Sequence, residues 1–167
     1  MIKEVAYQVE AVNELVNKTI KLLDESGNRK RLVFKAPTGS GKTVMASQML
    51  DELTTQLAEV EKEVAIIWIA PNKLHQQSYM RMKNYFSETR VLRPVMYDEL
   101  DHSTNGYIKP GEIFFVNWES INKDKNIMVR DTENSSSLYD IVQRTKDEHD
   151  MPVIVVIDEE HMFGGRA

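Results

Sequence analysis

The sequence predicts an α/β fold with a mostly parallel sheet, and three observations lead to this prediction. Residues 64–70 form an apolar run without alternation, which suits a central strand covered on both faces, and residues 153–157 suit a second buried strand. Segments with apolar residues at helical spacing separate the expected strands, as in a sheet whose parallel strands are joined by helices. The length of 167 residues suits one domain of roughly 100–200 residues with a proper core.

The first elements are expected in the following order. Apolar residues recur at steps of three and four over residues 2–23, which predicts a helix that Gly27 ends. Residues 31–36 are expected to form a short strand that leads into a glycine-rich turn. A second helical pattern follows over residues 44–57.

The later elements complete the alternation of strands and helices. Residues 74–86 predict another helix, and residues 113–116 predict a third buried strand. A polar loop is expected over residues 131–137. Ser137 and Asp140 then resemble a capping box that opens a helix before the last strand.

Composition excludes several classes of function. The net charge of −5, from 21 Lys+Arg and 26 Asp+Glu, gives no general attraction to nucleic acid or membrane, so any such contact must be local. The absence of cysteine excludes disulfides, zinc ribbons and thiol catalysis. The four histidines lack metal-ligand spacing. No apolar run approaches the ~18 residues of a membrane span, and no signal peptide opens the chain, so a cytoplasmic location without membrane contact is expected.

The most informative motif is Ala-Pro-Thr-Gly-Ser-Gly-Lys-Thr at residues 36–43, between an expected strand and an expected helix. The two glycines allow backbone N–H groups to turn around phosphate oxygens, and the helix N-terminus adds positive charge. Lys42 is expected to reach the β- and γ-phosphates, and the Thr43 hydroxyl to bind Mg²⁺. A turn without function is the alternative, and Ala36 stands where the general pattern has Gly. The expected nucleotide-binding residues are Pro37, Thr38, Gly39, Ser40, Gly41, Lys42 and Thr43.

A second motif, Asp158-Glu159-Glu160-His161, directly follows the last expected strand. Asp158 is expected to hold Mg²⁺ through water, and Glu159 to orient and deprotonate an attacking water. The alternative is that this acidic cluster is simply the solvated end of a strand. The phosphate loop upstream favours the functional interpretation, because hydrolysis of a nucleoside triphosphate needs a carboxylate on the metal side.

Together the two motifs resemble motifs I and II of superfamily 2 helicases and translocases of the DExH kind. The resemblance implies that Gln8 recognises adenine. The alternative is that Gln8 is an exposed glutamine at the start of a helix. The resemblance also implies that Asn72 and Lys73, in a segment similar to motif Ia, contact the nucleic-acid backbone. The alternative is a plain strand-to-helix turn, which would have a similar sequence.

Residues 115–123, read with residues 34–39, resemble the restriction (Res) subunit of type III restriction-modification enzymes; the alternative is an ordinary strand and loop in which Trp118 anchors the core. The resemblance implies a RecA-like P-loop NTPase fold, a three-layer α/β/α sandwich, of which residues 1–167 are the N-terminal part. A second RecA-like domain and a nuclease domain are expected to be absent. In this family the strand that carries motif III usually lies between the phosphate-loop and motif II strands. The resemblance therefore implies either a gap or altered pairing there, or completion of the sheet by another chain.

The resemblance implies that the complete protein hydrolyses ATP, with Mg²⁺, to move on double-stranded DNA, and that a modification (Mod) methyltransferase subunit is a partner. Three alternatives remain: a nucleotide-binding module without appreciable ATPase activity, another superfamily 2 DNA or RNA helicase, or a phosphate-loop kinase or transporter ATPase. The acidic motif after the last strand disfavours the third. A GTPase is disfavoured because Lys125 stands where the guanine-reading motif needs Asp.

Overall fold

The computed structural model describes residues 6–27, 30–36, 40–87, 91–100, 103, 105–121 and 137–159. These residues belong to two compact units, Met1–Lys62 and Glu63–Ala167. The first unit holds two helices and the second holds the sheet with its own helices. None of the helices among the described residues has the length and apolar character of a transmembrane span.

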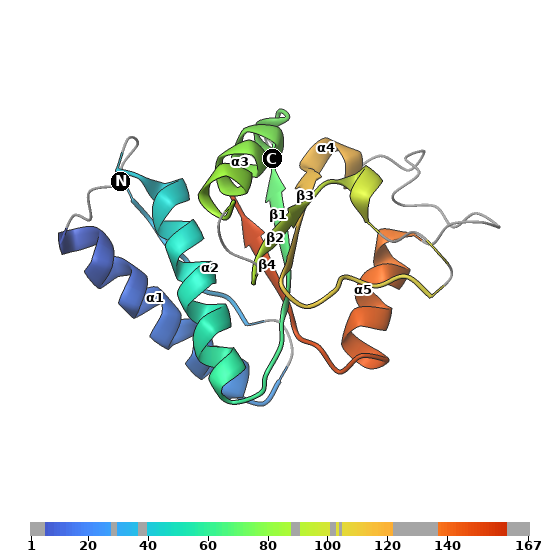
Figure 1. Ribbon diagram of the computed structural model, residues 1–167, viewed down its shortest axis with the longest axis horizontal. Helices are drawn as coiled ribbons and strands as arrows, with labels where there is room; N and C mark the ends of the chain where they lie inside the picture. Colours follow the sequence, from blue (N-terminus) through green and yellow to red (C-terminus); the bar gives the residue numbers. More distant parts are fainter. Residues whose placement is uncertain are drawn as a thin grey trace, which may run out of the picture. The chain divides into compact units, whose positions relative to one another are not determined.

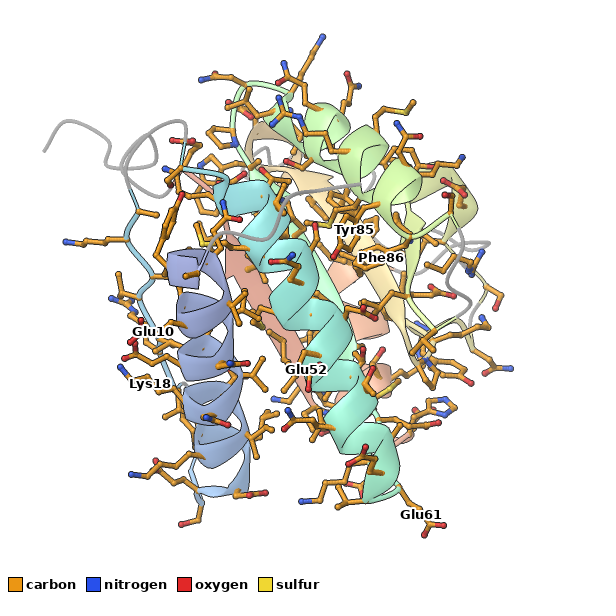
Figure 2. The ribbon with its side chains drawn as sticks, turned by 60° about the vertical axis from the view of Figure 1, so that its left-hand side comes forward. Glu10, Lys18, Glu52, Glu61, Tyr85 and Phe86 are labelled. Carbon is orange, nitrogen blue, oxygen red and sulfur yellow. The ribbon has the colours of Figure 1, made fainter. Side chains whose placement is uncertain are left out.

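In the first unit, helices α1 (Ala6–Asp24) and α2 (Lys42–Glu59) lie side by side (Figures 1 and 2). Both helices match the predicted apolar spacing. Glu10 and Lys18 project from the side of α1 that faces away from α2 (Figure 2). Val9 is exposed. Seven apolar residues of the two helices are buried, as expected for amphipathic helices: Val12, Leu15, Val16, Met45, Leu50, Leu53 and Leu57.

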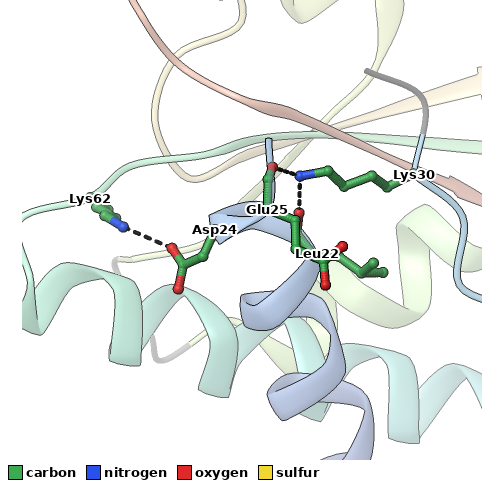
Figure 3. Close-up of polar contacts among 5 residues, drawn as sticks. All are labelled: Leu22, Asp24, Glu25, Lys30 and Lys62. Carbon is green, nitrogen blue, oxygen red and sulfur yellow. Dashed lines mark hydrogen bonds and ion pairs between the residues drawn. The ribbon is translucent and has the colours of Figure 1, made fainter. Parts of the chain in front are cut away.

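The C-terminal end of α1 is held by two lysines (Figure 3). The Lys30 ammonium donates hydrogen bonds to the backbone carbonyls of Leu22 and Glu25, which the end of the helix leaves without partners. Lys62 Nζ forms an ion pair with Asp24 at 3.0 Å. These contacts fasten the segments on either side of α2 to the end of α1.

The strand predicted at residues 31–36 is wrong. Residues 30–36 have no regular secondary structure, and the side chains of Leu32 and Val33 are exposed. The Leu-Val-Phe sequence favours a strand, but a strand also needs a neighbour to hydrogen-bond with. The described sheet pairs β2, β3, β1 and β4, and residues 30–36 pair with none of them.

The second unit is built on a parallel sheet in the order β2-β3-β1-β4. Its strands are β1 (Ala65–Ala70), β2 (Arg93–Val95), β3 (Glu112–Asn117) and β4 (Val153–Ile157). Strand β1 lies between β3 and β4 and is buried along its whole length, as predicted for a central strand. The predicted α/β class with a parallel sheet is therefore confirmed.

Helices cover both faces of this sheet (Figure 1). On one face, Tyr79 of α3 (Leu74–Tyr85) packs edge-on against Phe115, with ring centroids 5.7 Å apart. On the other face, Ile141 of α5 (Leu138–Asp147) joins the core cluster that contains Ile67 and Phe114. Because successive residues of a strand point to opposite faces, the two helices form separate layers, which gives the unit its three-layer α/β/α arrangement.

Ser137 is the N-cap residue of α5, which confirms one half of the predicted capping box. The Ser137 hydroxyl accepts a hydrogen bond from the Asp140 backbone N–H at 3.2 Å. Three short elements were not predicted: β2, a 3₁₀ turn at Tyr97–Glu99 and α4 (Trp118–Ile121). Each spans only three or four residues, too few to show a periodicity. Most of the predicted polar loop, residues 131–136, lies outside the described residues.

Strand β4 is at the edge of the sheet, so its prediction as a buried strand is wrong. It pairs with β1 on one side, and no strand among the described residues pairs with its other side. The side chains of Val155 and Ile157 are 50% and 48% exposed. An aliphatic run has the same sequence in a central and in an edge strand, because burial is decided by neighbours far away in the chain.

Candidate functional site

The described part of the phosphate loop leads directly into α2. Gly41 is the N-cap residue, with a left-handed φ of 86°, and Lys42 and Thr43 begin the helix. No side chain among the described residues caps this helix, and its first turn contains no acidic residue. The N–H groups of this turn therefore suit an anion. Residues 37–39 of the loop lie outside the described residues.

Gln8 and Tyr7 both hold the phosphate loop through one carbonyl oxygen. The Tyr7 hydroxyl donates to the Ser40 carbonyl at 2.9 Å, and Gln8 Nε2 donates to the same oxygen at 3.0 Å. Gln8 is only 9% exposed, so it is not an exposed glutamine at a helix start. The left-handed φ of Gly41 favours glycine, and a Cβ there would lie 2.7 Å from Gln8 Nε2, so the Gln8 side chain would have to shift.

In the second unit, the carboxyl ends of three parallel strands bring the other candidate residues together. Ala70 at the end of β1 lies opposite Asn117 at the end of β3. On the other side, the Asp158 backbone N–H donates to the Ile69 carbonyl at 2.9 Å. The turn after β1, which contains Asn72 and Lys73, and the acidic residues after β4 therefore follow neighbouring strands at the same edge of the sheet.

Glu159 adopts a left-handed backbone conformation with φ 57°. For a residue with a Cβ, this conformation costs roughly 1–3 kcal/mol and is concentrated at functional sites. Glu159 comes immediately after Asp158, at the end of β4. Glu160 and His161 lie outside the described residues.

The turn after β1 is held by residues that sequence reasoning did not assign to the site. Glu119 accepts from the Asn72 N–H, and Asn117 Oδ1 accepts from the Lys73 N–H. Both acceptors come directly after the apolar run at 113–116. If residues 113–116 had been expected to pair in parallel with residues 64–70, the two acceptors could have been predicted to lie beside Asn72 and Lys73. Trp118, between them, is partly buried against the core cluster.

His75, in the first turn of α3, is buried, and no partner for its Nδ1 occurs among the described residues. Burial lowers the pKa of His75 from its usual 6.5, and the neighbouring Glu119 carboxylate opposes that shift. The folded protein therefore holds the imidazole in its neutral form to a lower pH than the unfolded chain does.

We expect His75 to make the fold sensitive to acid. Because its pKa is lower in the folded state, the unfolded state binds more protons. The stability is fully present above pH 6.5 and is lost as the pH falls through the folded-state pKa. In thermal melts at a series of pH values, His75→Phe should lose less stability below pH 6.5 than the wild type. His149→Phe, a change of an exposed histidine, is the control, and identical pH profiles for all three proteins would contradict the expectation.

The candidate Mg²⁺ ligands are the Thr43 hydroxyl and the Asp158 carboxylate, both hard oxygen donors of the kind that Mg²⁺ prefers. Among the described residues, no group of three His, Asp or Glu side chains is close enough to hold a metal ion. Thr43 lies in the first unit and Asp158 in the second, and each by itself is a donor that fits Mg²⁺, which usually binds through one or two protein oxygens together with waters and substrate phosphates.

Comparison with known protein families identifies the family of this chain. The chain matches the family model described as type III restriction enzyme, res subunit, over residues 1–166. The chain belongs to this family. It is thus related to the N-terminal domain of superfamily 2 helicases, which confirms the resemblance drawn from the two motifs. The family supports a helicase-like ATP-binding module. A comparison with curated proteins gave no match.

Proposed function

We propose that this chain binds ATP with Mg²⁺ and forms the ATPase part of a Res-type enzyme that moves on double-stranded DNA. The observation that supports this most directly is the phosphate loop at the start of α2, with the Ser40 carbonyl bonded by both Tyr7 and Gln8. A glycine-rich turn without function needs no buried side chain to fix its backbone. A complete enzyme of this kind would act with a modification (Mod) subunit.

In this proposal the first unit binds the nucleotide. The loop N–H groups and the Lys42 ammonium hold the phosphates, and the Thr43 hydroxyl is a ligand of Mg²⁺. Gln8 reads the base: its Nε2 is bonded to the loop, whereas its Oε1 can accept a hydrogen bond from the adenine N6 amino group. Guanine has a carbonyl oxygen at that position, which would repel the Gln8 oxygen.

The second unit supplies the groups for hydrolysis. Asp158 would hold Mg²⁺ through water, and the bound ion would supply positive charge to the substrate phosphates. Glu159 would orient a water for attack on the γ-phosphorus and accept its proton, while the bond from the γ-phosphorus to the bridging oxygen breaks and ADP leaves. Asn72 and Lys73, in the turn after β1, contact the phosphate backbone of the nucleic acid. A module that binds nucleotide without turnover, and a helicase acting on RNA, are the other candidates.

The experiment that tests this function is a calorimetric titration of the chain with Mg²⁺ and a non-hydrolysable ATP analogue. We expect saturable binding, and weaker binding of the matching GTP analogue. Gln8→Leu should lower the affinity for the ATP analogue about tenfold, the effect of one or two lost hydrogen bonds, and reduce the preference over GTP. Gln56→Leu, near the far end of α2, is the matched control. Equal affinity of wild type and Gln8→Leu for both nucleotides would reject adenine recognition by Gln8.

A further inference from the structure

The turn between β1 and α3 has an unusual backbone. Asn72 and Lys73 are consecutive left-handed residues, with φ 53° and 61°. Asparagine tolerates this conformation because its short polar side chain can bond locally, but lysine has no such compensation. Two such residues in a row persist only where the surroundings fix them.

Two side chains provide that fixation, Asn117 at the end of β3 and Glu119 in α4. Both Glu119 oxygens lie within reach of the Asn72 backbone nitrogen, at 3.0 and 3.3 Å, and Asn117 Oδ1 accepts from the Lys73 N–H at 3.1 Å. A third bond, from the Leu74 N–H to the Pro71 carbonyl at 2.9 Å, closes the turn.

These bonds decide which groups of the turn can meet a ligand. The N–H groups of Asn72 and Lys73 are occupied, so they are not the donors for a phosphate. The Asn72 and Lys73 side chains are exposed and carry an amide and an ammonium group. We propose that Asn117 and Glu119 are positioning residues for nucleic-acid binding: they hold the turn in its left-handed conformation, so that these two side chains meet the phosphate backbone in a fixed geometry.

The inference rests on the proposed function, because it assigns the turn to nucleic acid. It also predicts an effect of removing Glu119 that is opposite to the effect expected from charge alone. Glu119 is negative, so its removal should strengthen binding to a polyanion if charge were its only effect. If Glu119 positions the turn, loss of its acceptor must weaken binding, because the turn then has to be ordered when the nucleic acid binds.

Two substitutions of Glu119 separate these effects, since both remove the charge and only one removes the acceptor. Affinity for a short fluorescent DNA duplex is measured by anisotropy over a series of salt concentrations. Glu119→Ala and Asn117→Ala should each weaken binding about three- to tenfold, whereas Glu119→Gln, which keeps an acceptor oxygen, should bind at least as tightly as the wild type. Glu10→Ala, with the same charge change on the outer side of α1, is the control and should not weaken binding.

The salt dependence distinguishes positioning from direct contact. Lys73→Ala should reduce the slope of log K against log salt by about 1, whereas Glu119→Ala should leave the slope unchanged. Amide hydrogen exchange at Asn72 and Lys73 reports on the turn without DNA, and it should be faster in Glu119→Ala and Asn117→Ala.

Two outcomes overturn the inference: unchanged exchange in both alanine variants, or Glu119→Ala binding as tightly as Glu119→Gln. Binding that does not depend on Lys73 would reject the nucleic-acid role proposed for the turn. That result is distinguishable, because the exchange measurement still shows whether Asn117 and Glu119 fix the backbone.

Discussion

Lys42→Ala is expected to remove detectable binding of the ATP analogue, a loss of roughly a hundredfold or more. The ammonium group would form charge-assisted bonds to two phosphates, each worth about 1.5–3 kcal/mol, and alanine supplies none of them. Lys42 begins α2 and forms no part of the buried core, so the fold should survive the substitution. Calorimetric titration with Mg²⁺ and the analogue measures the effect.

Lys62→Ala is the matched control for Lys42→Ala. Lys62 lies in the same unit and forms an exposed ion pair with Asp24, so its removal changes the net charge equally without touching the loop. We expect it to bind the analogue as the wild type does. If Lys42→Ala binds normally, the loop does not hold phosphates through this lysine and the ATPase assignment fails.

Glu159→Gln is expected to slow ATP turnover by about 10²–10⁴-fold while leaving binding of the analogue unchanged. The amide keeps the size and the hydrogen-bonding oxygen of the carboxylate, but it does not accept a proton at neutral pH. Phosphate release in the presence of Mg²⁺ and DNA measures turnover, and calorimetry measures binding.

Glu148→Gln, an exposed position just after α5, is the control for Glu159→Gln and should keep the wild-type rate. A Glu159→Gln variant that hydrolyses ATP at the wild-type rate would contradict the role of general base. A wild-type chain that binds the analogue and has no turnover would favour the alternative of a nucleotide-binding module.

Local patterns predicted most of the fold. The helical spacing in α1, α2 and α3 and the apolar run of β1 depend on neighbours in the sequence, and the structure has these elements where they were expected. The errors at residues 31–36 and at β4 have a common cause, since pairing and burial of a strand depend on partners that periodicity does not specify.

The candidate site was predictable to a similar extent. The motifs at 36–43 and 158–161 were visible because chemistry fixes both residue type and spacing. The contacts of Asn117 and Glu119 could not be predicted from local sequence, because their hydrogen-bond partners lie 44 and 47 residues away in the chain. The contact between Gln8 and Ser40, across 32 residues, was hidden for the same reason.

The open edge of β4 has a consequence for handling the protein. Its sequence, Val-Ile-Val-Val-Ile, has no charge, no proline and no glycine, and its backbone groups on one side have no strand partner among the described residues. An uncharged β-branched edge is a template onto which a second molecule can add its own strand. We therefore expect this chain to self-associate increasingly as its concentration rises.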